Sequence, residues 1–163
     1  MGRKKEYITK ITNKDTNAFR LLFYAHHVPR TLLNITDNRL KSYIKQGLAE
    51  RCISINKNEP IIRCTDKGRE FIGKLDGFRG HKPYQNLTAS EHNILLAEKI
   101  SCLTAEQQEK WYSEKDLWSI YNQKLEELRQ SDFERWREIV DNVNVSSCDG
   151  GIIGEGSVEL VEI

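Results

Sequence analysis

The sequence has 163 residues, with 25 Lys and Arg against 24 Asp and Glu, so its formal net charge is only +1. Apolar residues make up 38% of the chain and charged residues 30%, a composition that supports a folded core and excludes a wholly disordered chain. No apolar run is long enough to cross a bilayer, and no secretory signal follows Met1. We therefore expect a cytoplasmic protein that makes no membrane contact.

The small net charge conceals an uneven distribution along the chain. Residues 1–82 carry 18 Lys and Arg against 8 Asp and Glu, whereas residues 83–163 carry 7 against 16. A basic half predicts a polyanionic partner, and the acidic half is then not expected to face the same partner. The sign changes near residues 77–87, which are rich in Gly and Pro and which we interpret as a linker.

Cysteine and histidine usage gives no sign of a bound metal. The cysteines are widely spaced and form no Cys-x-x-Cys pair, and the four histidines do not complete a zinc motif. We therefore expect reduced thiols, no metal site and no cofactor, and we identify no catalytic residue.

The chain begins with a basic arm, residues 1–12, in which Arg3, Lys4 and Lys5 are candidates for DNA contact. A first helix is predicted from a cap at Asn13 or Asp15 to about His27. Its apolar residues recur on one face: Ala18, Leu21, Leu22 and Ala25. A short helix at residues 30–34 is expected after Pro29.

The next predicted helix runs from Asp37 to about Gln46. Thr36 is a suitable N-cap, and Gly47 suits a left-handed residue just beyond the helix. Leu40 and Ile44 lie one turn apart and are expected to face inward. The polar residues on the other side are expected on the outer surface: Asn38, Arg39, Lys41, Ser42 and Lys45.

A hairpin and a further helix complete the basic region, which we delimit as residues 13–76. The alternation in residues 52–55 and the run 60–64 predict two strands, joined at Asn56–Asn58. Thr65 can cap a helix that runs to about Leu75.

Residues 88–145 are predicted to be helical, because four Ser or Thr residues are each followed three residues later by an acidic or amide side chain, as in a capping box. The pairs are Thr88/Glu91, Thr104/Gln107, Ser113/Asp116 and Ser131/Glu134. Trp111, Trp118 and Leu125 recur every seven residues, a spacing that suits dimerisation. Residues 146–163 are expected to form a Gly-rich segment and a terminal strand. The predicted fold is therefore α+β and mainly α.

Helix, short helix, helix, hairpin and helix is the element order of a winged helix-turn-helix, and two short motifs add to the resemblance. Leu48–Arg51 resembles the entry into the wing in winged helix proteins of bacteria, phages and plasmids, and Thr65–Phe71 resembles the exit from it. The resemblance covers residues 14–75. It implies that the helix Asp37–Gln46 enters the major groove of DNA.

The chain also has a more distant similarity to plasmid replication-relaxation proteins, in which a winged helix precedes a histidine-containing helix and a Gly-rich segment with an acidic strand. The matching positions are His92, Asp149-Gly150 and Glu159–Glu162. Carboxylates at Asp149, Glu159 and Glu162 raise the alternative of a Mg²⁺-dependent nuclease. No Lys follows Glu159 or Glu162 at the spacing of such nucleases, so surface carboxylates are the simpler interpretation.

These patterns favour a sequence-specific duplex DNA-binding protein that is not an enzyme. We expect a homodimer that regulates transcription or assists replication, partition or transfer of a plasmid, phage or other mobile element. The expected DNA contacts are Asn38, Arg39, Lys41, Ser42 and Lys45 on the groove helix, Lys57 and Asn58 at the hairpin tip, and Arg3, Lys4 and Lys5 on the arm. The alternative is a winged-helix docking module whose acidic half binds a protein partner.

Overall fold

The computed structural model describes residues 10–25, 27–53, 58–78, 88–143 and 147–163. It is a mainly helical α+β structure with two small antiparallel sheets, which confirms the predicted fold class. The chain divides into two compact units, residues 1–109 and residues 110–163. The first unit contains 19 Lys and Arg against 12 Asp and Glu, and the second contains 6 against 12, so the first is basic and the second acidic.

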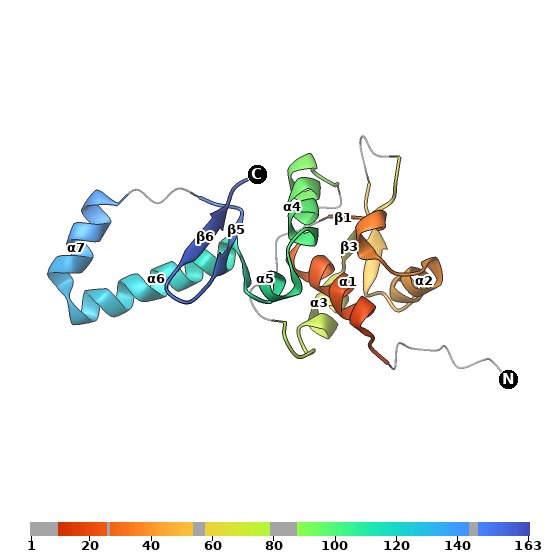
Figure 1. The fold of residues 1–163 in the computed structure, drawn as a ribbon, viewed down its shortest axis with the longest axis horizontal. Coiled ribbons are helices and arrows are strands. Elements are labelled where there is room, and N and C mark those ends of the chain that lie inside the picture. Colours follow the sequence, from red (N-terminus) through yellow and green to blue (C-terminus); the bar gives the residue numbers. More distant parts are fainter. Residues whose placement is uncertain (1–9, 26, 54–57, 79–87, 144–146) are drawn as a thin grey trace. The chain divides into compact units, whose positions relative to one another are not determined.

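The first unit combines helices with a three-stranded sheet (Figure 1). Its elements in chain order are α1 (Asn13–Tyr24), β1 (Val28–Pro29), the 3-10 helix η1 (Arg30–Leu33), α2 (Asp37–Lys45), β2 (Ala49–Arg51), β3 (Ile61–Cys64), α3 (Asp66–Ile72), α4 (Glu91–Ser101) and α5 (Ala105–Glu109). The strand order is β1-β3-β2, with both pairings antiparallel. Because β3 is central, its apolar residues Ile61 and Ile62 are fully buried.

Helix α1 forms the centre of the core of this unit. It contacts β3, α3 and α4, and the four residues predicted to form its apolar face are all buried. The ring of Phe19 stacks on Tyr43 of α2 at a centroid distance of 4.8 Å and meets Phe71 of α3 edge-on at 5.7 Å. The aromatic contacts thus connect three helices that are distant in the sequence. The helix ends at Tyr24 and not near His27, which is buried just before β1.

The boundary between the units lies after Glu109, and not at the linker expected at residues 77–87. Ile94, Ala97 and Ile100 of α4 are buried, and α4 packs against β1 and α1. Phe78, at the start of the expected linker, meets Phe23 edge-on at 5.9 Å. The sign of the charge changes before α4, but the apolar face of α4 joins it to the basic unit.

The C-terminal end of α2 is joined tightly to the start of α3. Gly47 has a φ of 72°, the left-handed conformation predicted for it. The Thr65 hydroxyl donates a hydrogen bond of 2.5 Å to the Gly47 carbonyl oxygen, and Thr65 also caps α3 as predicted. At Gly68 a Cβ atom would lie 1.9 Å from the carbonyl oxygen of Leu48, so any larger residue would force the backbone to shift.

The second unit packs a small sheet against a long helix. Its elements are β4 (Trp111–Ser113), α6 (Glu114–Ser131), α7 (Phe133–Asn142), β5 (Gly150–Ile153) and β6 (Val158–Val161). The strand order is β4-β5-β6, all antiparallel, and β6 is the terminal strand predicted from the sequence. Strand β4 was not predicted. Trp111 is 1% exposed on β4 and therefore does not belong to a helical repeat with Trp118 and Leu125.

Helices α6 and α7 bury very little of their surface. Asp116 is the one buried residue of α6, and α7, all of which is described, has none. The apolar residues of α6 at Trp118, Tyr121, Leu125 and Leu128 are half-buried. On α7 and just after it, Phe133, Val140 and Val143 are 56%, 47% and 52% exposed. The apolar periodicity of this region therefore does not form a closed core within the unit.

Membrane-crossing segments were searched among the described residues. No helix there combines the length and the apolar character that crossing a bilayer requires.

Candidate nucleic-acid interface

Helix α2 forms because its two ends are capped locally. The Thr36 hydroxyl accepts a hydrogen bond from the Arg39 amide at 3.2 Å, and Asp37 lies in the first turn, where a negative charge is favourable. Lys45 lies in the last turn, and the left-handed Gly47 follows. Leu40 and Tyr43 are buried, whereas Ile44, which was predicted to face inward, is only half-buried.

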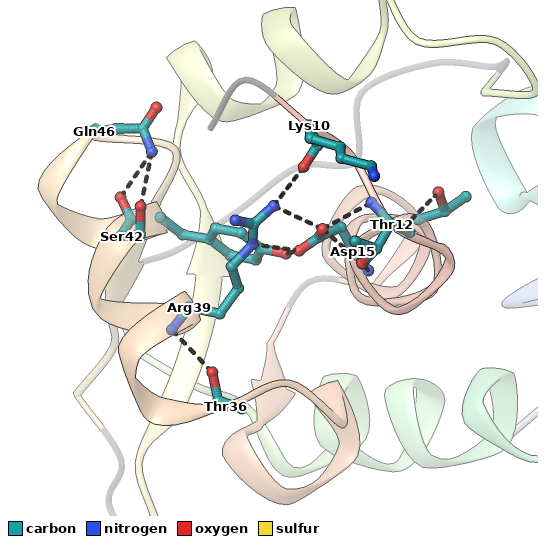
Figure 2. Close-up of polar contacts among 9 residues, drawn as sticks. Lys10, Thr12, Asp15, Thr36, Arg39, Ser42 and Gln46 are labelled. Atoms are coloured by element: carbon teal, nitrogen blue, oxygen red, sulfur yellow. Dashed lines mark hydrogen bonds and ion pairs between the residues drawn. The ribbon is translucent and has the colours of Figure 1, made fainter. Parts of the chain in front are cut away.

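The inward side of α2 is fixed to α1 by a polar group that we call the Asp15 cluster: Asp15, Arg39 and Tyr43 (Figure 2). Arg39 donates from Nε to Asp15 Oδ1 at 2.8 Å and from Nη2 to Asp15 Oδ2 at 2.7 Å. The Tyr43 hydroxyl donates to Asp15 Oδ1. Asp15 is 1% exposed and also completes the capping box of α1 with Thr12. The carboxylate therefore has partners for both oxygens, as a buried charge requires.

These contacts change the ionisation of the cluster. Burial by itself raises the pKa of Asp15, but hydrogen bonds from Arg39, Tyr43 and Thr12 outweigh it and lower the pKa well below its ordinary value. Burial and the hydrogen bond to Asp15 raise the pKa of Tyr43. The hydrogen bond to Asp15 likewise raises the pKa of Arg39. The cluster therefore holds an ionised Asp15, a neutral Tyr43 and a cationic Arg39 at neutral pH.

This arrangement corrects the prediction that the Arg39 side chain lies free on the outer surface of α2. Its side chain is 31% exposed, and its guanidinium turns toward α1. Nη2 also donates to the backbone carbonyl of Lys10 at 2.8 Å. Arg39 thus connects three segments of the chain. The sequence pattern missed this role because its partner Asp15 is distant along the chain.

The outward side of α2 presents the other four predicted residues together: Asn38, Lys41, Ser42 and Lys45. Their spacing of three, four and seven residues places them on one face of the helix. Asn38, Lys41 and Lys45 are exposed, and Ser42 is half-buried. Within the described part of the chain, neither lysine forms an ion pair. This face therefore offers two positive charges and two polar side chains to a partner.

Two residues that were not predicted belong to the same surface. Gln46 donates from Nε2 to the Ser42 hydroxyl oxygen at 3.0 Å, so one acceptor site of that hydroxyl is occupied within the helix (Figure 2). Lys67 of α3 is exposed and donates from Nζ to the Gln46 carbonyl at 2.7 Å. A third cation therefore lies at the C-terminal end of α2.

The turn before α2 is also held by a cation that was not predicted. Arg30 donates from Nη2 to Asp37 at 2.8 Å and to the Ile35 carbonyl at 2.6 Å. Arg30 thereby connects η1 to the first turn of α2 and neutralises Asp37, the one acidic residue in that first turn.

The hairpin is described only in part. Asn58 is exposed, while Lys57 lies outside the described residues. The adjacent Glu59 accepts from the Thr31 hydroxyl at 2.8 Å, which ties the loop between β2 and β3 to η1. The candidate arm residues Arg3, Lys4 and Lys5 likewise lie outside the described residues, whereas Lys10 is described and exposed.

The positions that carry the similarity to replication-relaxation proteins are distributed over both units. His92 is exposed on α4 of the first unit. Asp149 and Glu159 lie in the second unit, where the Asp149 carboxylate accepts from the Ile163 amide at 2.8 Å. Among the described residues, no three His, Cys, Asp or Glu side chains gather as a metal-binding group. The four cysteines are free thiols.

No family model, curated protein or solved structure matches the chain. Its function is therefore inferred from the geometry of its own residues.

Proposed function

We propose that the first unit is a winged helix-turn-helix domain that binds duplex DNA, with α2 in the major groove. The order α1, η1, α2, β2, β3, α3 supports this assignment, as does antiparallel pairing of β2 with β3. The major groove is wide enough to admit one α-helix, and α2 carries its polar and cationic residues on a single side.

The observation that carries the proposal is the contrast between the two sides of α2. Its inward side is fixed by Leu40, Tyr43 and the ion pair with Asp15, while its outward side leaves Lys41 and Lys45 exposed. A helix held rigidly with its cations outward is preorganised for a polyanion. Ser42 lies between these cations and Asn38 lies one turn before Ser42, and both supply donors and acceptors that can read base edges.

The cellular role that we propose is regulation of transcription, or assistance to the replication, partition or transfer of a mobile element. The protein acts in the cytoplasm on this proposal. Lys57 and Asn58 extend the contact to phosphate beside the groove, as the wing of such a domain does.

Binding to random duplex over a series of salt concentrations tests the proposal. Each phosphate contact contributes about 0.9 to the slope of log affinity against log salt, so Lys41→Gln with Lys45→Gln should flatten that slope by about two. The matched control is Lys74→Gln with Lys124→Gln, which removes the same charge from exposed lysines outside α2. Equal slopes for the two double variants would contradict the placement of α2 on DNA.

Base reading requires a second measurement. A target is first selected from a random pool, and affinity for it is then compared with affinity for random duplex. Asn38→Ala or Ser42→Ala should lower the ratio of the two affinities by about tenfold, the value of one lost base contact. Equal losses on both duplexes would show that these residues do not read the sequence.

We also propose that the protein is a homodimer whose copies meet through α6 and α7. The apolar residues of this surface recur at heptad spacing in two separate sets: Trp118, Tyr121, Leu125 and Leu128 on α6, and Phe133, Trp136, Val140 and Val143 on α7 and just after it. Phe133, Val140 and Val143 are exposed and the other five are half-buried, which supports an interface that a second copy covers. Val140→Glu should halve the mass measured by sedimentation while leaving the helical circular dichroism unchanged. Glu138→Gln, an exposed change on the same helix, is the control. An unchanged mass for Val140→Glu would contradict this interface.

The second unit favours one alternative function. Its acidic charge and the exposed Val158 and Leu160 on the edge strand β6 suit docking to a basic protein. A chain that fails to shift random duplex even at low salt, yet binds a basic protein partner, would support this docking function over DNA binding.

A further inference from the structure

We infer that Gln46 is a positioning residue that makes the Ser42 hydroxyl a hydrogen-bond donor toward the major groove. The base beside Ser42 is then read for an acceptor, with guanine preferred and cytosine disfavoured. This inference rests on the proposed DNA-binding function. It names the specificity of one position in the target and assigns that specificity to two side chains that lie one helical turn apart.

The side chains of Ser42 and Gln46 meet through two hydrogen bonds (Figure 2). Gln46 Nε2 lies 3.0 Å from the Ser42 hydroxyl oxygen and 3.2 Å from the Ser42 backbone carbonyl oxygen. A carbonyl oxygen can only accept, so the Gln46 amide must turn its NH2 group, and not its oxygen, toward both atoms. The Ser42 hydroxyl therefore accepts from Gln46, and its own hydrogen is left for another acceptor.

The hydroxyl hydrogen of Ser42 is not used within the described part of the chain. A serine in a helix commonly donates to the backbone carbonyl three or four residues earlier, as Ser131 does to Glu127 at 2.9 Å. The hydrogen bond of the Ser42 hydroxyl among the described residues is the one that it accepts from Gln46. Its hydrogen is therefore available to a partner on the outward face of α2.

The backbone that carries Gln46 is itself held in place. Lys67 Nζ donates to the Gln46 carbonyl at 2.7 Å, and the Gln46 amide nitrogen donates to the Ser42 carbonyl at 3.1 Å. The next residue, Gly47, accepts from the Thr65 hydroxyl at 2.5 Å. Because the backbone at Gln46 is fixed, its side chain approaches Ser42 from a defined direction, and the donor is preorganised before DNA binds.

A hydroxyl that is held as a donor distinguishes the bases in the major groove. Accepting from Gln46 occupies one of the two acceptor sites of Ser42 and polarises its O–H bond, which strengthens donation. The guanine edge presents the acceptors N7 and O6, whereas the cytosine edge presents the N4 amino donor. Guanine beside Ser42 therefore gains a hydrogen bond, while the cytosine amino group meets a hydroxyl that is oriented to donate.

Base preference at one position of a selected target tests the inference. A target is selected from a random pool with the parent protein, and the position at which Ser42→Ala loses its preference identifies the base beside Ser42. The parent should bind guanine there about five- to tenfold more tightly than cytosine, the value of one hydrogen bond. Gln46→Met keeps the length of the side chain without its amide, and it should reduce this ratio to about twofold or less. A ratio equal to that of the parent would overturn the inference.

Gln46→Glu reverses the hydrogen bond and provides a second test. A carboxylate can only accept, so the Ser42 hydroxyl should donate to it and present its lone pairs to the groove. Cytosine at this position should then bind at least as tightly as guanine. Lys45→Gln is the matched control, because it lowers the charge of the same face by the same amount and should keep the preference for guanine. A Gln46→Glu protein with the preference of the parent would contradict the inference.

The outcomes separate this inference from the proposed function. General destabilisation of a variant would lower its affinity for all four bases together, so the ratio at one position isolates the hydrogen bond. Any preference that depends on Asn38 should stay unchanged in both Gln46 variants. A parent protein that binds no duplex would overturn the proposed function. A parent protein that binds duplex, but in which Ser42→Ala alters no base preference, would overturn this inference alone.

Discussion

The two units of this protein achieve order in different ways. The basic unit is held by contacts between distant segments, such as Asp15 with Arg39 and the ring of Phe19 on Tyr43. In the acidic unit, the ion pairs of α6 and α7 lie within one helix at a separation of three or four residues, and Phe133 and Val140 of α7 are exposed. The basic unit can thus present a fixed polar surface, whereas the acidic unit presents an apolar surface that association would cover.

The tryptophans make this comparison measurable. Trp111, Trp118 and Trp136 all belong to the acidic unit, so intrinsic tryptophan fluorescence reports on that unit alone. Far-ultraviolet circular dichroism reports on the helices of both units. A substitution that affects only the basic unit should therefore shift one signal and not the other.

The largest expected effect is that of Asp15→Asn. Removing one partner of a buried ion pair costs about 3–5 kcal/mol, because the other charge is left uncompensated. Urea unfolding followed by circular dichroism should show this loss, and the tryptophan transition should stay in place. Coincident shifts of both signals would show that the two units unfold as one.

The same residue predicts how stability depends on pH. The pKa of Asp15 is lowered in the folded state, so its contribution is present above its ordinary value of about 4 and is lost as the pH falls below that value. Asp15→Asn should therefore flatten the decline of stability in acid. The check is urea unfolding of both proteins at several pH values from neutral downward. A parallel decline in both would assign the acid sensitivity to other carboxylates.

A smaller loss is expected from Gly68→Ala. Its Cβ would press on the carbonyl oxygen of Leu48, and overpacking of this kind costs about 1–3 kcal/mol. Thermal unfolding followed by circular dichroism measures the loss. Gly156→Ala tests the acidic unit with a glycine that has open space around it but a φ of 74°, so its cost of about 1–2 kcal/mol comes from backbone strain alone. A Gly68→Ala protein as stable as the parent would contradict the close approach.

Asp116→Asn should have an effect similar to or smaller than that of the glycine changes. Asp116 completes the capping box of α6 with Ser113, as Asp15 does for α1 with Thr12. Loss of a helix cap costs about 0.5–2 kcal/mol. The unfolding midpoint measured by tryptophan fluorescence should fall, because this signal reports on the acidic unit. The part of the circular dichroism transition that comes from the basic unit should not change, which is the reverse of the pattern for Asp15→Asn.

The capping residues show how far local sequence signals extend. Thr36, Thr65 and the boxes Thr104/Gln107 and Ser113/Asp116 were predicted and are confirmed. At three other helices the cap differs from the prediction: it is Thr12 and not Asn13 or Asp15, Ser90 and not Thr88, and Asp132 and not Ser131. Several good cap residues lie within three positions of each other there, and only the packing of the helix selects among them.

Features that depend on distant contacts could not be predicted. The helical period placed Asn38, Lys41, Ser42 and Lys45 on one face correctly, because that spacing is a property of the helix itself. It also placed Arg39 on the surface, because nothing in the pattern identifies Asp15 as its partner. The linker at residues 77–87 was expected from the change of charge along the chain, whereas the packing of α4 in the first unit depends on its burial in three dimensions.

The joint between α2 and α3 has a mechanical consequence. Gly68 packs directly against the Leu48 carbonyl, and the Thr65 hydroxyl is hydrogen-bonded to the Gly47 carbonyl. The end of α2 and the start of α3 are therefore in close contact. Tightly packed contacts transmit displacement and do not absorb it. A displacement of α3 would therefore be transmitted to α2.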